Sequence, residues 1–131
     1  MKKGFTLIEL LVTITIMMVV MGVSLVAFNA TRASARDARR KADVEALRSA
    51  LELYRSDLGG YPATLALLAP TYIAAIPTDS LAGRLYSYTP GGTATYTLCA
   101  AVENPGSSGA VAGCGSCGSS PIVCNYKTTN P

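Results

Sequence analysis

One carboxylate stands out in this sequence because of the residues around it. Glu9 is the only charged residue between Phe5 and Phe28, and the stretch from Leu10 to Phe28 carries no charge at all. A carboxylate in such an apolar segment is costly to bury unless it is paired, and it usually marks a function. We therefore treat Glu9 as the first candidate site residue of the chain.

The second group that could do chemistry is a set of four cysteines in the last third of the chain. They are Cys99, Cys114, Cys117 and Cys124. Cys114 and Cys117 have the C-x-x-C spacing of zinc knuckles and redox motifs, while an oxidising compartment would favour disulfides. Of the three possible pairings, we expect Cys99 with Cys124, which would tie the tail to the segment before it, and Cys114 with Cys117. A zinc site of four thiolates and a thiol oxidoreductase remain alternatives.

Residue types for catalysis are missing elsewhere in the sequence. There is no histidine, no phosphate-binding P-loop and no nucleophile elbow. Outside the charged segment that follows Phe28, no two carboxylates are placed to share the roles of general acid and general base. We expect a protein that is not an enzyme, with no cofactor and no metal site.

The first predicted element is a long apolar helix. About 20 apolar residues are enough for a helix to cross a bilayer, so the segment from Phe5 to Phe28 predicts a membrane-inserting helix. A secretory signal peptide cleaved at Ala33-Ser34-Ala35 is the alternative, but the apolar run exceeds the usual length of about 7 to 15 residues. Basic residues lie on both sides of the run, so counting charges gives no orientation.

The residues from Gly4 to Val12, GFTLIELLV, resemble the N-terminal motif of type IV pilins and of type II secretion pseudopilins. In that family a short basic leader ends in Gly, the next residue is Phe, and a Glu follows four positions later. The resemblance implies that a membrane-embedded prepilin peptidase cleaves between Gly4 and Phe5 from the cytoplasmic side and N-methylates Phe5. Residues 1–4 would then be a prepilin leader peptide.

The same resemblance implies that Phe5 and Glu9 act in subunit assembly. Cleavage would leave an ammonium group on Phe5, and a buried ammonium needs a nearby anion, which Glu9 supplies in the same or an adjoining subunit. The implied protein is a pilin, held in the cytoplasmic membrane by a single helix and then polymerised into an extracellular type IV pilus-like filament. Its implied partners are further copies of the chain, the prepilin peptidase, a cytoplasmic assembly ATPase and a platform protein.

Two other functions stay open at the level of sequence. A pseudopilin of a type II secretion system, major or minor, carries the same motif. A monomeric membrane-anchored binding protein would keep its N terminus unprocessed. Six of the eleven basic residues lie between Arg32 and Arg48, and because acidic residues are interspersed among them, contact with anionic headgroups is favoured over contact with nucleic acid.

Beyond Phe28 the composition changes from apolar to charged and predicts an amphipathic helix over 30–58. Its apolar positions recur at spacings of three and four residues and share one face. They are Val44, Leu47, Leu51, Tyr54 and Leu58. The charged residues are expected to form pairs four residues apart, such as Asp37 with Lys41, and to remain in water. Gly59-Gly60 should end the helix.

The remaining residues, 59–131, predict a small head that contains a β-hairpin. Residues 84–89 and 93–100 alternate with period two on either side of Pro90-Gly91-Gly92. The side chains expected to cover the apolar face of the helix are Tyr86 and Tyr88 on one strand and Tyr96, Leu98 and Ala100 on the other. A short helical turn is expected within 63–69.

Together these elements predict an α+β fold, in which a long N-terminal α-helix packs against a small antiparallel β-sheet head, as in pilins. The expected organisation is a leader at 1–4, a transmembrane or filament-core helix at 5–29, and a globular head at 30–131. Within the head, the C-terminal region should carry disulfides.

The segment from 59 to about 100 also resembles, more weakly, the head of major pseudopilins. In those proteins a loop after the hairpin binds calcium through several oxygen ligands. Here only two acidic residues, Asp79 and Glu103, follow Asp57. Since a calcium ion takes six to eight oxygen ligands, often from several carboxylates, we expect no calcium site.

Overall fold

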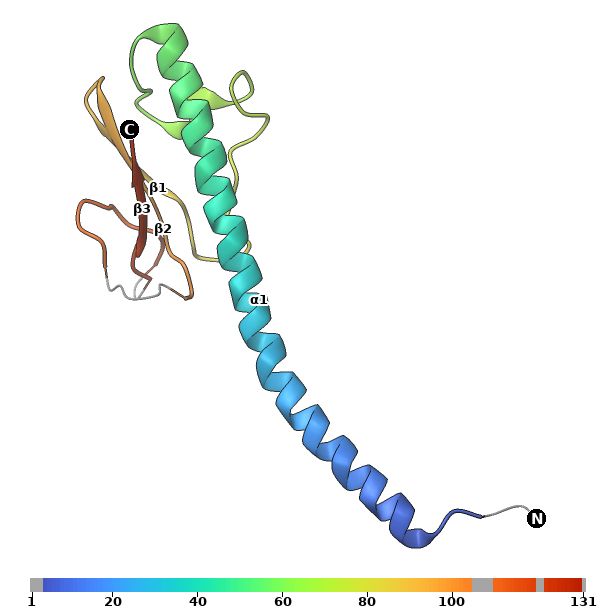
Figure 1. Ribbon diagram of the computed structural model, residues 1–131. Coiled ribbons are helices and arrows are strands. Elements are labelled where there is room, and N and C mark those ends of the chain that lie inside the picture. The colour runs from blue at the N-terminus through green and yellow to red at the C-terminus, as the bar shows by residue number, and fades with distance from the viewer. Residues whose placement is uncertain (1–3, 105–109, 120–121, 131) are drawn as a thin grey trace. The chain divides into compact units, whose positions relative to one another are not determined.

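The structure, a computed structural model, describes residues 4–104, 110–119 and 122–130, apart from the side chains of 24–27 (Figure 1). Lys2 and Lys3, and with them most of the expected leader, lie outside the described residues. The chain forms two compact units, Met1–Ser34 and Ala35–Pro131. One long helix and a small three-stranded antiparallel sheet are its main elements, which confirms the expected α+β fold.

The long helix, α1 (Leu7–Leu58), runs through the apolar and the amphipathic segments without interruption. It ends where expected, at Gly59. The φ angle of Gly59 is 78°, in the left-handed region that glycine adopts without strain. The Gly59 N–H donates to the Arg55 carbonyl at 2.8 Å and so satisfies one of the last carbonyls of the helix.

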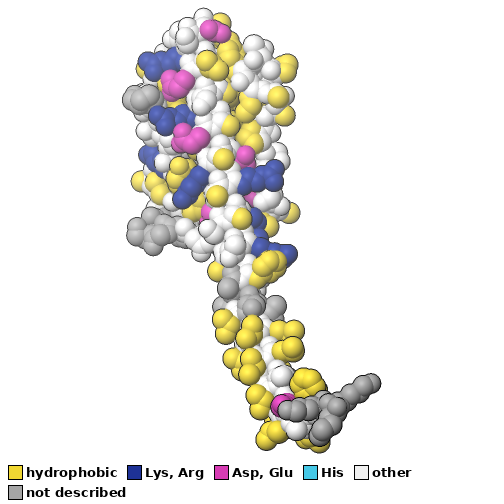
Figure 2. All heavy atoms as spheres, turned by 45° about the vertical axis from the view of Figure 1, so that its right-hand side comes forward, with side chains coloured by type: hydrophobic (Ala, Val, Ile, Leu, Met, Phe, Trp, Pro, Cys, Tyr) yellow, Lys and Arg dark blue, Asp and Glu magenta, His cyan; other side chains and the backbone are white. Residues whose placement is uncertain are grey.

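In the first unit, the apolar side chains of α1 are exposed. This holds for every residue from Leu7 to Val23, and Leu7 itself is 83% exposed. Hydrophobic side chains therefore dominate the lower part of the space-filling view (Figure 2). Among the described residues, α1 is the one helix long and apolar enough to cross a membrane. An exposed apolar surface of this extent is typical of a segment that inserts into a membrane or binds a partner.

The core of the second unit lies between the last turns of α1 and the sheet. Val44, Leu47 and Leu51 are completely buried and Tyr54 packs at the edge of their cluster, which confirms four of the five predicted core positions. The prediction for Leu58 is wrong, because this side chain is 63% exposed. Leu58 is the last residue of α1, and the chain turns away immediately after it at Gly59.

The sheet has the order β1 (Ser87–Gly91), β2 (Thr95–Ala100) and β3 (Tyr126–Thr129). The predicted hairpin is confirmed, but its turn lies later than expected. Pro90 belongs to β1, opposite Tyr96, and the chain reverses after Gly91, with Gly92 at a φ of 79°. Pro90 is tolerated there because β1 is an edge strand.

β2 carries the side chains that cover α1. Tyr96, Leu98 and Ala100 are each at most 2% exposed and belong to the same cluster as Leu47, as expected. Tyr86 and Tyr88 pack against that cluster and are partly buried, and Tyr86 lies just before β1 instead of within it. The aromatic residues of the hairpin are therefore core residues of the head.

Two short elements complete the head. The 3₁₀ helix η1 (Leu65–Leu68) confirms the predicted helical turn and adds Leu68 to the core. β3 was not predicted, because its four residues are too few to show an alternating pattern. It pairs with β2 so that Ala100 lies opposite Tyr126 and Cys99 opposite Lys127.

The disulfides differ from the expected ones. They join Cys99 to Cys114 and Cys117 to Cys124, with Cα–Cα distances of 6.0 and 5.3 Å. Cys99 lies opposite Lys127 in the sheet. Cys124 precedes Lys127 by three residues, which span roughly 10 Å in an extended chain. A disulfide needs Cα atoms within about 7 Å. The predicted pairing of Cys99 with Cys124, and with it that of Cys114 with Cys117, is therefore wrong.

Candidate functional site

The helix that carries the first candidate site residue begins with a capping box formed by Thr6 and Glu9. The Thr6 N–H and the Thr6 hydroxyl each donate to Glu9 Oε2 at 2.8 Å, and the Glu9 N–H donates to Thr6 Oγ1 at 3.3 Å. These bonds satisfy N–H groups that the first turn of a helix leaves without partners. They explain why α1 begins at Leu7 although the apolar run starts at Phe5.

Sequence reasoning missed the role of Thr6. The signal was present, because Thr-Leu-Ile-Glu is the S/T-x-x-E pattern of a capping box directly before an apolar run. Glu9 drew attention through its charge alone, which hid its local use. The structure thus adds Thr6 to the predicted pair of Phe5 and Glu9.

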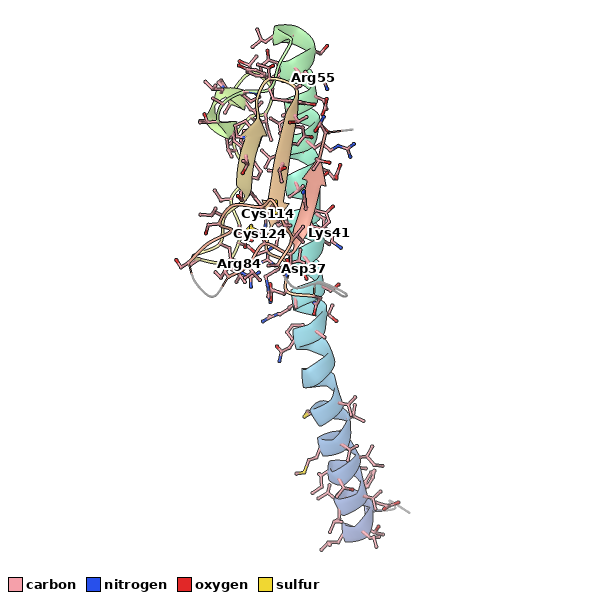
Figure 3. The ribbon with its side chains drawn as sticks, turned by 90° about the vertical axis from the view of Figure 1, so that its left-hand side faces the viewer. Asp37, Lys41, Arg55, Arg84, Cys114 and Cys124 are labelled. Atoms are coloured by element: carbon pink, nitrogen blue, oxygen red, sulfur yellow. A yellow bond between two sulfur atoms is a disulfide. The ribbon has the colours of Figure 1, made fainter. Side chains whose placement is uncertain are left out.

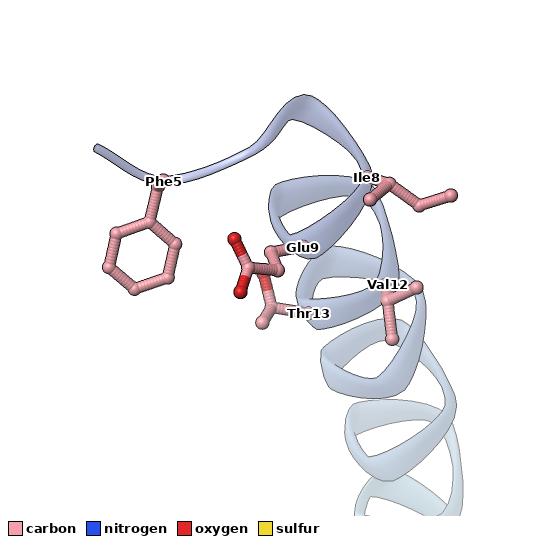
Figure 4. A pocket seen from close by; sticks show the side chains of 5 residues that line it. All are labelled: Phe5, Ile8, Glu9, Val12 and Thr13. Atoms are coloured by element: carbon pink, nitrogen blue, oxygen red, sulfur yellow. The ribbon is translucent and has the colours of Figure 1, made fainter. Parts of the chain in front are cut away.

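The carboxylate of Glu9 lies in a small hollow at the start of α1 (Figure 4). The hollow is lined by Phe5, Ile8, Glu9, Val12 and Thr13. Both Thr6 donors reach the same oxygen of Glu9, Oε2, and no donor of the described residues reaches Oε1. One oxygen of the carboxylate is therefore committed to the helix cap, while the other can accept a bond from a cation.

The Gly4–Phe5 bond, where cleavage is expected, precedes the helix in a segment without regular secondary structure. Phe5 is 84% exposed, and a Cβ atom added at Gly4 would meet no described atom within 4 Å. An exposed peptide bond outside regular secondary structure is what a peptidase can bind. The described chain leaves room for a side chain at Gly4, so the fold itself does not require glycine there. A requirement for glycine would come from a molecule that binds this segment, such as the expected peptidase.

The four cysteines do not form a metal site in this structure, because all of their sulfur atoms are in disulfides. Cys99, Cys117 and Cys124 are buried together with Ala101, and Cys114 packs against them. Cys99 alternates along β2 with Leu98 and Ala100, so its side chain points to the face of the sheet opposite the main core. The disulfides thus cross-link the far side of the head.

A buried charge cluster in the second unit was not predicted. Its centre is Arg40, which is only 1% exposed. The Arg40 guanidinium donates to both oxygens of Asp79, at 2.6 and 3.0 Å, to Asp37 at 2.7 Å and to Glu103 at 2.8 Å. Arg36 adds two bonds to Glu103, at 2.7 and 2.6 Å. The expectation that Asp37 pairs with Lys41 and remains in water is wrong, because Asp37 is 5% exposed and binds Arg40.

This charge cluster joins three segments that are far apart in the sequence. Asp37 lies on α1, where the connection from β2 to β3 meets the helix, and it accepts the backbone N–H groups of Glu103 and Asn104 at 2.8 Å (Figure 3). Asp79 brings in the loop before β1 and also accepts the Leu81 N–H. Because every bond runs inside the head, the cluster is a structural tie and offers no free group for chemistry.

The carboxyl groups of the cluster are held ionised by their partners. Hydrogen bonds from Arg36, and then from Arg40, lower the pKa of Glu103 to about 2 despite burial. Burial alone would raise the pKa of Asp37 and of Asp79, but hydrogen bonds outweigh it and both pKa values are lowered. The bond to Asp79 is the main cause of the raised pKa of Arg40.

Comparison with known proteins supports the predicted prepilin-like motif at the N terminus. Residues 1–25 match the family model of the prokaryotic N-terminal methylation motif, which is the type IV prepilin-like signal. No curated protein and no solved structure shows a significant match to the chain.

The fold and the site together define a class of protein. It has a prepilin-like signal on a long, apolar N-terminal helix, and that helix continues into a head with a small antiparallel sheet. This combination is consistent with the pilin and pseudopilin family, whose members are structural proteins processed at the N terminus.

Proposed function

We propose that the chain is the structural subunit of a type IV pilus-like filament, held in the cytoplasmic membrane by α1 until it is assembled at the cell surface. The observation that carries this proposal is the methylation motif over residues 1–25, placed on a helix whose apolar side chains are exposed. In the membrane lipid covers those side chains, and in the filament the helices of neighbouring subunits replace the lipid.

In this proposal Glu9 sets the register of assembly. Cleavage after Gly4 leaves a methylated ammonium group on Phe5, and Glu9 accepts it through Oε1, either within one subunit or from the next. Where the pair forms between subunits, a subunit one step out of register would bury both charges without partners, which costs several kcal/mol. The pair therefore selects the docked position more than it adds net attraction.

Glu9 can serve this purpose without uncapping its helix. Oε2 stays bonded to Thr6 and keeps the first turn of α1 closed, while Oε1 turns to the cation. The Phe5–Thr6 peptide bond survives cleavage, so the Thr6 N–H that caps the helix is still present in the mature chain.

Mass spectrometry of the protein isolated from its own cells tests the proposal. We expect a chain that begins at Phe5 and carries one methyl group on its N terminus. A chain that retains Met1 and still forms filaments would contradict the assigned processing. A chain that retains Met1 and forms none would favour a monomeric membrane-anchored protein.

A pseudopilin of a type II secretion system is the second candidate, because pseudopilins carry the same N-terminal signal. The two candidates differ in the amount and the place of the polymer. A pilus subunit should be the main protein of filaments sheared from the cell surface, whereas a pseudopilin should stay with the cell envelope and a minor one should be present in few copies.

A further inference from the structure

Five basic residues follow the apolar run, and the structure divides them into two groups. They are Arg32, Arg36, Arg39, Arg40 and Lys41. Arg36 and Arg40 are bound by carboxylates inside the head, and the ammonium group of Lys41 lies 5.7 Å from the centre of the Tyr126 ring. Within the described residues, Arg32 and Arg39 have no carboxylate partner.

Arg32 has a distinctive neighbour in the first unit. Its guanidinium carbon lies 4.3 Å from the centre of the Phe28 ring, the geometry of a cation–π stack. Phe28 is the last residue of the apolar run, and this residue is 53% exposed. Arg32 is thus held at the boundary between apolar and polar sequence, one helical turn beyond Phe28.

The stack leaves the hydrogen-bonding edge of the guanidinium open. No acceptor among the described residues takes a bond from the Arg32 side chain, so its N–H donors are open to partners other than these residues. The planar fork of a guanidinium matches two oxygens of a phosphate group, and a ring that supports its flat face leaves that fork free.

We propose that Arg32, supported by Phe28, binds the phosphate of an anionic phospholipid headgroup and marks how deep α1 sits in the membrane before assembly. This inference rests on the membrane insertion of α1 proposed above. Basic side chains at the end of a spanning segment extend toward the headgroup layer, and each attracts anionic lipid. Carboxylates of the head pair with Arg36 and Arg40, so these two side chains are not available to lipid. Arg32 is then the main cation at the boundary between the apolar and the charged sequence.

The sequence provides a clean probe, because the chain contains no tryptophan. Phe28→Trp keeps an aromatic face under Arg32 and introduces a single reporter at the proposed site. The full-length variant is reconstituted into vesicles of phosphatidylcholine and phosphatidylglycerol in equal parts, with bromine atoms near the headgroup of only one of the two lipids. Bromine quenches tryptophan only at short range, so the two quenching efficiencies report which lipid lies beside the residue.

We expect brominated phosphatidylglycerol to quench more than brominated phosphatidylcholine, with a local preference of about fivefold for the anionic lipid. In the same background Arg32→Gln should bring the two efficiencies to parity. Arg39→Gln is the matched control, because it removes one exposed cation, without a carboxylate partner in the described part of the chain, seven residues further along. That variant should keep the preference.

Parity in the parent variant would overturn the proposal, and so would an equal loss in Arg32→Gln and Arg39→Gln, which would indicate general attraction by net charge. A failure of the underlying insertion looks different. In that case neither brominated lipid quenches the tryptophan, while acrylamide in the aqueous phase does.

Discussion

At the scale of single residues, Glu9 combines two tasks that are usually separate. One of its oxygens closes the first turn of α1 with Thr6, and the other is open to a cation. Charge and hydrogen-bonding capacity can therefore be removed independently. A glutamine keeps the acceptor oxygen that a capping box needs, but it carries no charge.

Glu9→Gln should preserve the helix cap yet strongly reduce incorporation into filaments, because the Phe5 ammonium would lose its counter-ion. Glu9→Ala should lose both the pairing and the carboxylate half of the cap, and keep only the bond from the backbone N–H of residue 9 to Thr6 Oγ1. Counting subunits in sheared filaments against the amount in the membrane fraction measures the effect. Normal filament yield from Glu9→Gln would show that the charge of Glu9 is not needed.

Thr6→Val should loosen the first turn of α1 while leaving the charge of Glu9 in place. Loss of an N-cap costs about 1 kcal/mol, so amide hydrogen exchange in that turn should be about fivefold faster. Thr6→Ser keeps the hydroxyl and is the matched control. If the valine and serine variants exchange at the same rate, the hydroxyl of Thr6 does not hold the cap.

At the scale of elements, α1 is one helix with two kinds of surroundings. Its first part has an exposed apolar surface, and its last turns bury one face against β2. Leu47 and Leu53 lie on the same helix and have the same side chain, but Leu47 is fully buried and Leu53 is 56% exposed. They separate the contribution of packing from that of helix propensity.

Leu47→Ala should lower the free energy of unfolding of the head by about 2–5 kcal/mol, because it leaves a cavity between α1 and the sheet. Leu53→Ala should change it by less than about 0.5 kcal/mol. Denaturant titration of the full-length chain in detergent, followed by the near-ultraviolet circular dichroism of its tyrosines, measures both values. Equal losses of stability in the two variants would contradict a core built around Leu47.

At the scale of the whole molecule, the head is held by ties between distant parts of the chain. Arg40 on α1 binds Asp79, 39 residues away, and Glu103, 63 residues away. Two disulfides cross-link the other face of the sheet. With little apolar sequence after β2, these ties replace part of the core that a larger domain would have.

The head should lose stability in acid. The pKa of Glu103 is about 2 in the folded chain against 4.5 for a free glutamate, so the stability it provides is complete above about pH 4.5 and is lost as the pH falls toward 2. Asp37 and Asp79, whose pKa values are also lowered, act in the same direction. Allowing for the part-exposed Arg36, Glu103 should contribute roughly 2 kcal/mol.

Denaturant titrations at several pH values measure this loss. Glu103→Gln should be less stable than the parent at neutral pH, because Arg36 and Arg40 lose a charged partner, and it should show a shallower decline between pH 4.5 and 2. Parallel curves for the two chains would mean that another group controls the acid transition.

Much of the fold could be predicted because its signals are local. The spacing of Val44, Leu47 and Leu51 predicts the buried face, and Gly59 predicts the end of α1, since both depend on residues within a few turns of one helix. The hairpin was found for the same reason, although its turn was misplaced. Leu58 was misjudged because helical periodicity does not show where the covering layer stops.

At the candidate site, Phe5 and Glu9 were predicted from composition and from the resemblance of GFTLIELLV to prepilins, and their roles in processing and assembly stay predictions. Thr6 was overlooked because it carries no charge. Arg40 looked like one of several exposed cations. Its burial depends on Asp79 and Glu103 reaching the same point from two different loops, which no pattern within α1 reveals.

The sequence by itself determined the membrane-type helix, its prepilin-like start, its amphipathic continuation and the α+β class. Each of these follows from side-chain periodicity or from a motif within about ten residues. Only the tertiary structure decided the cysteine pairing, the third strand and the partners of Arg40. These features depend on contacts between residues that are far apart in the sequence. The packing of the whole head decides which of those residues come close enough to bond.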